Sequence, residues 1–245
     1  MIKKGWEFNL LFIKVSLSNK FNLLFILLLP LCILFLNDYN ELLSVESQSE
    51  KVSAMLGWIA FIITITAISG VGINLSILRE QGFLKMFYYI SGSISSIVLG
   101  LLISQALVTS SIIVLFSLIV SFAFSINTFY LISFSLILLI VGFIPTCLLS
   151  LIITVFPLKQ GTLNPILFII MFPLIYITSF NTAEISFVHL LNPIQLLSSI
   201  GIEFLYIESI NKANVLVGFS MLVIFMLLGL VCIKLMRIMP VESRS

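Results

Sequence analysis

Charged residues are scarce in this sequence, and their scarcity decides the class of protein. Only 9% of the residues are Asp, Glu, Lys or Arg, whereas 60% are hydrophobic. A soluble protein of this length needs many more polar side chains to cover its surface. Apolar runs of roughly 20 residues, the length that crosses a bilayer, recur along the whole chain. The sequence therefore predicts an all-α integral membrane protein with a single membrane domain over residues 1–245.

Histidine, cysteine and nucleotide-binding motifs are also scarce or missing. The one histidine, His189, and three cysteines in separate apolar runs indicate neither a disulfide framework nor a metal site. A serine hydrolase would need a histidine near a membrane-embedded serine, and His189 falls in a different segment from the Ser-Gly pairs. No glycine is followed by Lys-Ser or Lys-Thr, so no phosphate-binding loop is encoded. We therefore expect no enzyme activity, no metal and no cofactor in this chain.

Six apolar segments are candidates for transmembrane spans. They cover residues 21–36, 52–77, 90–122, 129–156, 163–180 and 213–233. The third is too long for one crossing unless its start lies outside or along the membrane. Residues 1–20 place lysines among apolar residues at helical spacing, which predicts an amphipathic helix in the membrane interface. Residues 181–212 are apolar but broken by Pro193 and Gly201, and we expect two short re-entrant helices in the outer leaflet there.

The lysines and arginines predict the orientation. With six spans both termini lie on one side, and ten of the twelve cationic residues fall on that side. The two on the other side are Lys51 and Lys212. Because cationic residues concentrate on the cytoplasmic side of a membrane, we expect a multi-pass cell-membrane protein with cytoplasmic termini. The net charge of +2 is too small to indicate a nucleic-acid partner.

The predicted spans themselves carry no charge. None contains Asp, Glu, Lys, Arg or His, and residues 86–158 hold no charged residue at all. Carriers driven by protons or sodium usually place ionisable groups at membrane depth, although backbone carbonyls can also bind sodium. If the protein moves a solute uphill, the energy is therefore expected to enter from elsewhere. An autonomous secondary carrier and a non-transporting membrane assembly or sensor protein remain the alternatives.

Small residues recur at steps of four along the third predicted span. They are Gly92, Ser96, Gly100 and Ser104. A helix face of small residues lets backbones approach closely in lipid, either within the chain or at a seam with a second chain. Gln105 follows and is the most deeply placed amide. It must hydrogen-bond within the bundle or to a polar part of a substrate.

The densest charge cluster lies between the second and third predicted spans, at residues 78–89. Its core, REQGFLK, is followed by Phe87, Tyr88 and Tyr89 and then by a Ser-Gly-Ser break. This run resembles the coupling loop of ABC-2 type transporter permeases, where R/E-E-x-G-x-L-(K/R) precedes an aromatic or apolar stretch and a small-residue break. That family also has an amphipathic first helix, a short second cytoplasmic loop and two short outer helices. Residues 1–20, 157–161 and 181–212 match those places.

The resemblance implies a bacterial permease subunit without its own ATPase. It would pair with a second permease, the same or homologous, and with two cytosolic ATP-binding subunits that hold ATP and Mg. In its compactness the chain looks like short permeases that export, or give immunity to, amphipathic and antimicrobial peptides. Drug, lipid or polysaccharide export stays open within the family. The residues implied to contact the ATPase are Arg79, Glu80, Gln81, Gly82, Phe83, Leu84 and Lys85, with Lys159 and Gln160 in the second loop.

Each residue of the coupling run has an expected role under this resemblance. Arg79 and Glu80 would make charge-assisted contacts with a soluble surface. Gly82 would let the chain turn, and Phe83 and Leu84 would give apolar anchorage. Lys85 and the two tyrosines would hold the following segment at headgroup level.

Overall fold

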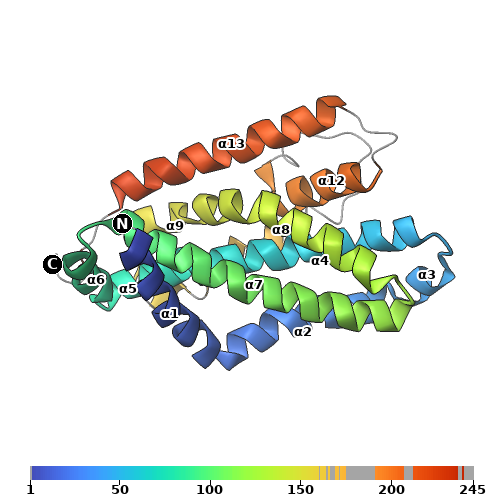
Figure 1. The fold of residues 1–245 in the computed structure, drawn as a ribbon, viewed down its shortest axis with the longest axis horizontal. Helices are drawn as coiled ribbons and strands as arrows, with labels where there is room; N and C mark the ends of the chain where they lie inside the picture. Colours follow the sequence, from blue (N-terminus) through green and yellow to red (C-terminus); the bar gives the residue numbers. More distant parts are fainter. Residues whose placement is uncertain are drawn as a thin grey trace.

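The protein is all-helical over the part that the structure describes. This computed structural model describes residues 2–159, 161–163, 165, 169–170, 172–174, 191–206, 212–236 and 239. Within those ranges there are helices and turns but no strand (Figure 1). Five of the helices there are long and apolar enough to cross a membrane, which agrees with the expected membrane-embedded, all-α fold.

The helices follow one another along the chain, with short connections from α1 as far as α9. In order they are α1 (Ile2–Ser18), α2 (Lys20–Asn37), α3 (Tyr39–Ser44), α4 (Gln48–Thr66), the π-helix η1 (Ala67–Ile73), α5 (Asn74–Glu80), α6 (Phe83–Ser91), α7 (Ile94–Phe124), α8 (Thr128–Ser150), α9 (Ile152–Val155), α12 (Pro193–Leu205) and α13 (Lys212–Leu235). The five candidate spans are α2, the continuous helix Gln48–Glu80, α7, the helix Thr128–Val155 and α13.

Five of the six predicted spans coincide with these long helices. The third is displaced, because residues 90 and 91 belong to α6 and α7 begins only at Ile94. The break has a local cause: Gly92 takes a left-handed φ of 76°, and the Ser93 side chain caps α7 by accepting from the Ser96 amide. Most of the fifth predicted span, 163–180, lies outside the described residues, as do residues 181–190 and 207–211 of the predicted outer segment 181–212.

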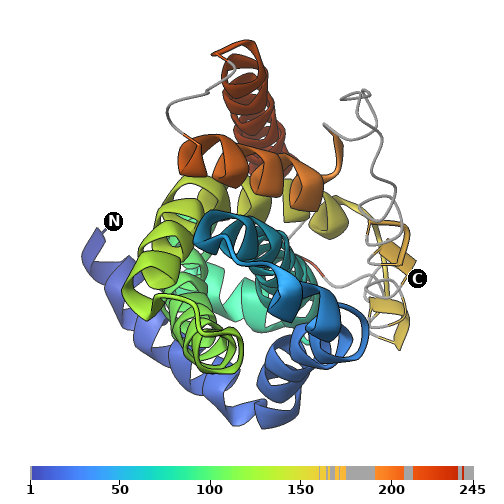
Figure 2. The same ribbon diagram turned by 90° about the vertical axis from the view of Figure 1, so that its right-hand side faces the viewer.

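One long helix forms the centre of the bundle. Residues Gln48–Glu80 run through α4, η1 and α5 without interruption, and most of this 33-residue helix is buried. Helices α2, α7, α8 and α12 pack around it, while α1 lies along α7 and α13 lies on the outer side of α8 (Figures 1 and 2). The bundle therefore has an α6 end, which carries α6 and α9, and an α3 end, which carries α3 and the start of α13.

The central helix extends beyond the predicted span 52–77 at both ends, and its charged residues lie in these extensions. These residues are Glu50, Lys51, Arg79 and Glu80. Lys51 and Arg79 are 28 positions apart (79 − 51). At 1.5 Å per residue this is about 42 Å, which exceeds the ~30 Å hydrocarbon core of a bilayer. The charges thus lie beyond the apolar layer, and the residues between them remain uncharged.

Two glycines set how closely the helices approach. A Cβ placed on Gly72 would lie 2.5 Å from the backbone oxygen of Ser150, so η1 touches the backbone of α8 directly. A Cβ on Gly229 would lie 2.6 Å from the Leu148 oxygen, so α13 rests on the same part of α8. Such contacts depend on dispersion between closely packed backbones, which is the main attraction between helices in lipid.

We expect Gly72→Ala to destabilise the protein and Gly57→Ala to leave it unharmed. The first places a methyl group against an immovable backbone oxygen, at a cost of about 1–3 kcal/mol. Gly57 lies on the same helix with nothing within 4 Å of a built Cβ, so alanine there should stabilise by roughly 1 kcal/mol or less. Thermal unfolding of both variants in detergent tests this, and equal midpoints for the two would contradict the packing described.

Candidate functional site

The turn between α5 and α6 is built on a glycine. α5 ends at Glu80 and α6 begins at Phe83, and Gly82 between them takes φ 79° and ψ −6°. Other residues pay roughly 1–2 kcal/mol for this left-handed conformation. No atom lies within 4 Å of a Cβ built on Gly82, so backbone conformation and not space requires glycine here. The turn reverses the chain at the tip of the central helix.

Arg79 is buried beside this turn and braces it. The side chain is 2% exposed, and its Nε donates to Glu80 Oε1 at 2.8 Å. Nη1 donates to the Thr154 oxygen at 2.6 Å, and Nη2 donates to the oxygens of Phe156 at 3.2 Å and Leu158 at 3.4 Å. These carbonyls at and beyond the end of α9 are the kind of groups that a helix terminus leaves unpaired. We call this set of bonds the Arg79 brace.

The brace assigns Arg79 a role different from the expected one. The coupling-loop resemblance predicts that the Arg79 guanidinium faces a soluble partner, but its donors point to backbone oxygens of its own chain. The Glu80 carboxylate pairs with it, and the Glu80 side chain is only 6% exposed. The two charges therefore join the loop after α5 to the loop that begins at Phe156. Partner contacts are expected in these same two loops, and the brace places them side by side.

The outward surface next to the brace combines apolar and cationic side chains. Helix α6 turns Leu84, Phe87 and Ser91 inward at steps of three and four, which is one face of a helix. Leu84 thus anchors α6 to the chain's own core and is not available to a partner. Six of the exposed residues form what we call the α6 surface: Gln81, Phe83, Lys85, Met86, Tyr89 and Lys159. Gln160 lies outside the described residues.

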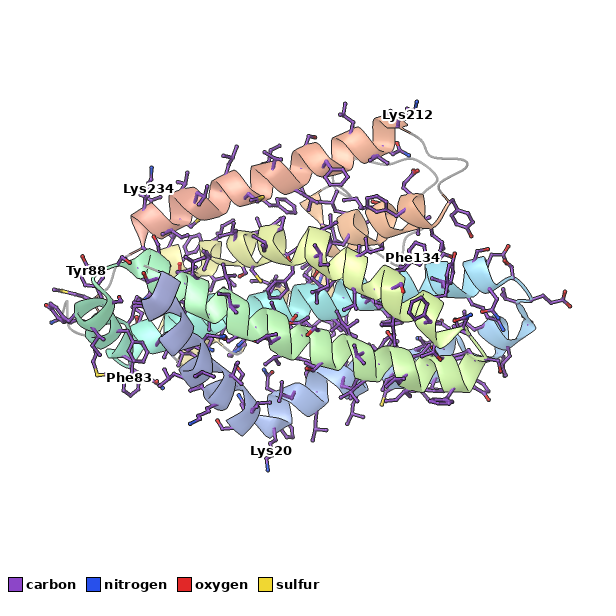
Figure 3. The ribbon with its side chains drawn as sticks, in the orientation of Figure 1. Lys20, Phe83, Tyr88, Phe134, Lys212 and Lys234 are labelled. Carbon is purple, nitrogen blue, oxygen red and sulfur yellow. The ribbon has the colours of Figure 1, made fainter. Side chains whose placement is uncertain are left out.

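Aromatic contacts connect α6 to the first helix. The ring of Phe83, which is 46% exposed, stacks on Phe87 with centroids 6.3 Å apart. Phe87 in turn meets the buried ring of Phe12 edge to face at 6.0 Å. Edge-to-face and offset-stacked arrangements are the favourable ones for aromatic pairs. A contact made on Phe83 therefore reaches α1 through two rings. Figure 3 shows Phe83 and Tyr88 at the tip of the bundle.

The small-residue face of α7 is buried within the chain. Ser96, Gly100 and Ser104 are all buried, and α1 lies along this part of α7. On the same turn, Gln105 Nε2 donates to Ser16 Oγ of α1 at 2.7 Å. Gly92 does not belong to this face, because it is exposed and precedes the helix. Of the two interpretations weighed for these residues, the structure favours packing inside the chain over a seam with a second permease.

The α3 end is fixed by bonds of the same kind. Lys51 Nζ donates to the Phe124 oxygen at 3.2 Å, at the end of α7. Gln48 Nε2 donates to the Ser125 oxygen at 3.1 Å, and Gln48 Oε1 accepts from the Asn127 amide at 3.3 Å. The start of the central helix is therefore tied to the α7–α8 turn. Nothing in the local sequence pattern singled out this pair of residues.

Charge is distributed unequally between the two ends of the bundle. In the part of the chain with described side chains, the α6 end carries four cationic residues and one acidic residue: Arg79, Lys85, Lys159, Lys234 and Glu80. The α3 end carries mostly acids: Asp38, Glu46, Glu50 and Glu203, with Lys51 and Lys212. Lys212 and Lys234 lie at opposite ends of α13 (Figure 3).

The exposed side chains of the α6 surface are amide, aromatic, thioether and ammonium groups. Among the described side chains, no group of three or more His, Cys, Asp or Glu residues is placed to hold a metal ion. Comparison of the chain with protein-family models, with curated proteins and with solved structures finds no match. The geometry of the two braced loops and the α6 surface is therefore the basis for any statement about function.

We expect Arg79→Lys to loosen the α6 end although it keeps the positive charge. A lysine offers one compact donor group and cannot spread its bonds over three carbonyls and a carboxylate as the planar guanidinium does. The loss of buried hydrogen bonds should lower the free energy of unfolding by about 1–3 kcal/mol. Hydrogen exchange of residues 154–159 should also become faster.

Lys85→Arg is the matched control, because Lys85 is exposed on the next helix. Thermal unfolding and hydrogen exchange of both variants in detergent make the measurement. If Arg79→Lys exchanges and unfolds like the unmodified protein, the brace does not hold the two loops together.

Proposed function

We propose that this chain is the permease subunit of an ABC-2 type exporter in a bacterial membrane. ATP hydrolysis on a separate cytosolic ATP-binding subunit would drive it, and that subunit would hold ATP and Mg. The observation that carries the proposal is the Arg79 brace. It joins the loop after α5 and the loop after α9 into one surface with exposed Gln81, Phe83, Lys85 and Lys159.

The central helix supplies the mechanical connection in this proposal. The α6 surface begins just beyond the end of that helix, and the helix packs against α2, α7, α8 and α12. A displacement of α6 by a closing ATPase therefore acts on the element that touches most of the bundle. The π-helix η1 lies within it, and π-helical turns often occur at functional sites. The helix can thus change its packing at η1 while both of its ends stay attached.

The excess of cations at the α6 end supports a cytoplasmic position for that end. The path of the chain supports a sixth crossing. α9 ends at the α6 end, whereas Asn192 Nδ2 donates to the Leu174 oxygen beside the start of α12. The first half of α12 packs at mid-bundle, where Leu197 touches Gly142 of α8. From there α12 leads back toward the α3 end, as a re-entrant outer helix would.

The cargo that best suits the bundle is hydrophobic or amphipathic. No charged residue lies between Lys51 and Arg79 on the central helix, over a length of about 40 Å. Our leading candidate is an amphipathic or antimicrobial peptide, with drugs, lipids and polysaccharides as the other cargoes of such exporters. The active complex would contain a second permease, the same or homologous.

We expect cysteine labelling to place the α6 end in the cytoplasm. In a variant whose three native cysteines are replaced, Lys85→Cys and Lys159→Cys should react with an impermeant thiol reagent only after the cells are opened. Glu46→Cys and Lys212→Cys, at the other end of the bundle, should react in intact cells. The reverse pattern would place the α6 surface outside and rule out a cytosolic ATPase as its partner.

We expect Phe83→Asp and Lys85→Glu to weaken the ATPase contact by roughly tenfold each, the effect typical of a central interface residue. Lys212→Glu is the matched control, because it makes the same charge reversal at the opposite end. The measurements are copurification of the ATP-binding subunit in mild detergent and ATP hydrolysis by the complex. The proposal fails if no ATP-binding subunit copurifies with the unmodified chain. Transport by the lone chain under a proton or sodium gradient would instead identify a secondary carrier.

A further inference from the structure

A cavity of about 560 Å³ lies under the junction of α1 and α2. We call this junction the elbow. It is centred on Asn19, which leaves helical geometry at φ −86° and ψ 63° and caps α2. The cavity walls come from the elbow, from η1 with α5, and from α7. Its volume lies within the usual range for small-molecule sites, about 300–1,000 Å³.

The wall of this cavity is rich in side-chain amides. Four carboxamides line it: Asn19, Asn22, Asn74 and Gln105. Gln105 is held in place, since its Nε2 donates to Ser16 Oγ and a Cβ on Gly70 would lie 2.5 Å from its Oε1. Gly70 therefore allows the Gln105 amide to lie flat against η1. The π-helix also contributes Ser69 to the wall.

Two of the four amide side chains make no hydrogen bond within the described part of the chain. They are those of Asn22 and Asn74, although the Asn22 backbone amide donates to Asn19 Oδ1. The hydroxyl groups of Ser18, Thr66 and Ser69 in the wall donate to backbone oxygens, and Ser16 Oγ accepts from Gln105. The carboxamides of Asn22 and Asn74 therefore offer both donors and acceptors, side by side as a peptide group does.

The lining of the cavity carries no charge, which limits the classes of ligand that it can bind. All lining residues are uncharged. A phosphate or carboxylate in this apolar setting would need a cationic partner, so anionic lipid headgroups do not fit. A second cavity of about 320 Å³ lies beside the same elbow, shares Leu23 and Val108 with the first, and is otherwise almost entirely aliphatic. It offers room for an apolar side chain next to the amides.

We propose that the elbow cavity binds an uncharged peptide backbone, with Asn22 and Asn74 hydrogen-bonding its amide groups. The apolar side chains of the same peptide occupy the neighbouring aliphatic cavity. Entry is lateral, past Phe21, which lines the cavity and is 83% exposed on the outside of α2. This inference rests on the proposed export function, because it names the site and the substrate class of that function within this chain.

The test uses the full chain in detergent and a five-residue probe peptide of leucine, phenylalanine and serine. The probe is acetylated, amidated and fluorescent, so it carries no charge. Asn74→Leu and Asn22→Leu should each weaken its binding roughly three- to tenfold, the worth of one neutral hydrogen bond. Asn74→Gln, which keeps a carboxamide, should retain most of the affinity. Asn37→Leu, the same change at the far end of α2 and outside the cavity, should have no effect.

A backbone N-methylated version of the probe makes the assignment specific. The methylated probe lacks the backbone N–H donors between its residues, so it should bind the unmodified chain more weakly and should bind Asn74→Leu with the same affinity. Equal binding of both probes by every variant would reduce the cavity to an apolar partition site and overturn the proposal. Displacement of the probe by phosphatidylglycerol added to the detergent micelles, but not by the unlabelled peptide, would identify a lipid site and overturn it as well.

The peptide-binding test can fail or succeed independently of the export proposal. Binding is measured without an ATPase, so a peptide site can be present in a chain that has no ATP-binding partner. Conversely, Asn22→Leu and Asn74→Leu could leave peptide binding and peptide-stimulated ATP hydrolysis by the complex unchanged. That result would overturn this inference and leave the export proposal intact. A thermal unfolding midpoint equal to that of the unmodified chain shows that a variant is folded.

Discussion

The α6 end of the molecule depends on one buried cation. A guanidinium removed from water destabilises a protein unless its charge and its donors are matched, and Arg79 meets both needs with one carboxylate and three carbonyls. Arg79 can make all of these bonds only while the backbone of residues 154–158 and the α5–α6 turn keep their conformations. The position of α6, the end of α9 and the direction of the second loop are therefore set together.

Hydrogen bonds from a cationic side chain to backbone oxygens also fix the other end of the central helix. Lys51 donates to the last turn of α7, as Arg79 donates to the end of α9. Both cations meet carbonyl oxygens at helix C-termini, where the helix dipole also favours positive charge. Since these anchors are about 42 Å apart, they lie beyond the hydrocarbon and leave the uncharged interior to be held by close packing at Gly72 and Gly229. The bundle is thus tied by polar bonds at its ends and by backbone contacts between them.

Much of the architecture could be predicted from the sequence, because length and hydropathy determine membrane spans and because Gly82 marks its turn. The errors have physical reasons. The carbonyl partners of Arg79 lie 75 to 79 positions away, and no local pattern encodes them. Gly92 fits the period-four spacing of Ser96 and Gly100, yet its positive φ ends one helix before the next begins, and the Ser-Gly-Ser run is the signal that indicated it. The π-helix has no sequence signature beyond the two glycines within it, Gly70 and Gly72, which lie close against Gln105 and Ser150.

The Arg79 brace and the elbow cavity lie on the same short stretch of one helix. Asn74 precedes Arg79 by five residues, which is about 7.5 Å along the axis. Between Asn74 and the anchored α3 end lies η1, the one described part of this helix with π geometry. A force applied at α6 therefore has a short path along this helix to the cavity wall. In the proposed exporter, the ATPase would act on the amides that hold the peptide, and a change of hydrogen bonding in η1 would move Ser69 and Asn74 relative to Gln105 on α7. Coupling and substrate release would then be one movement of the central helix.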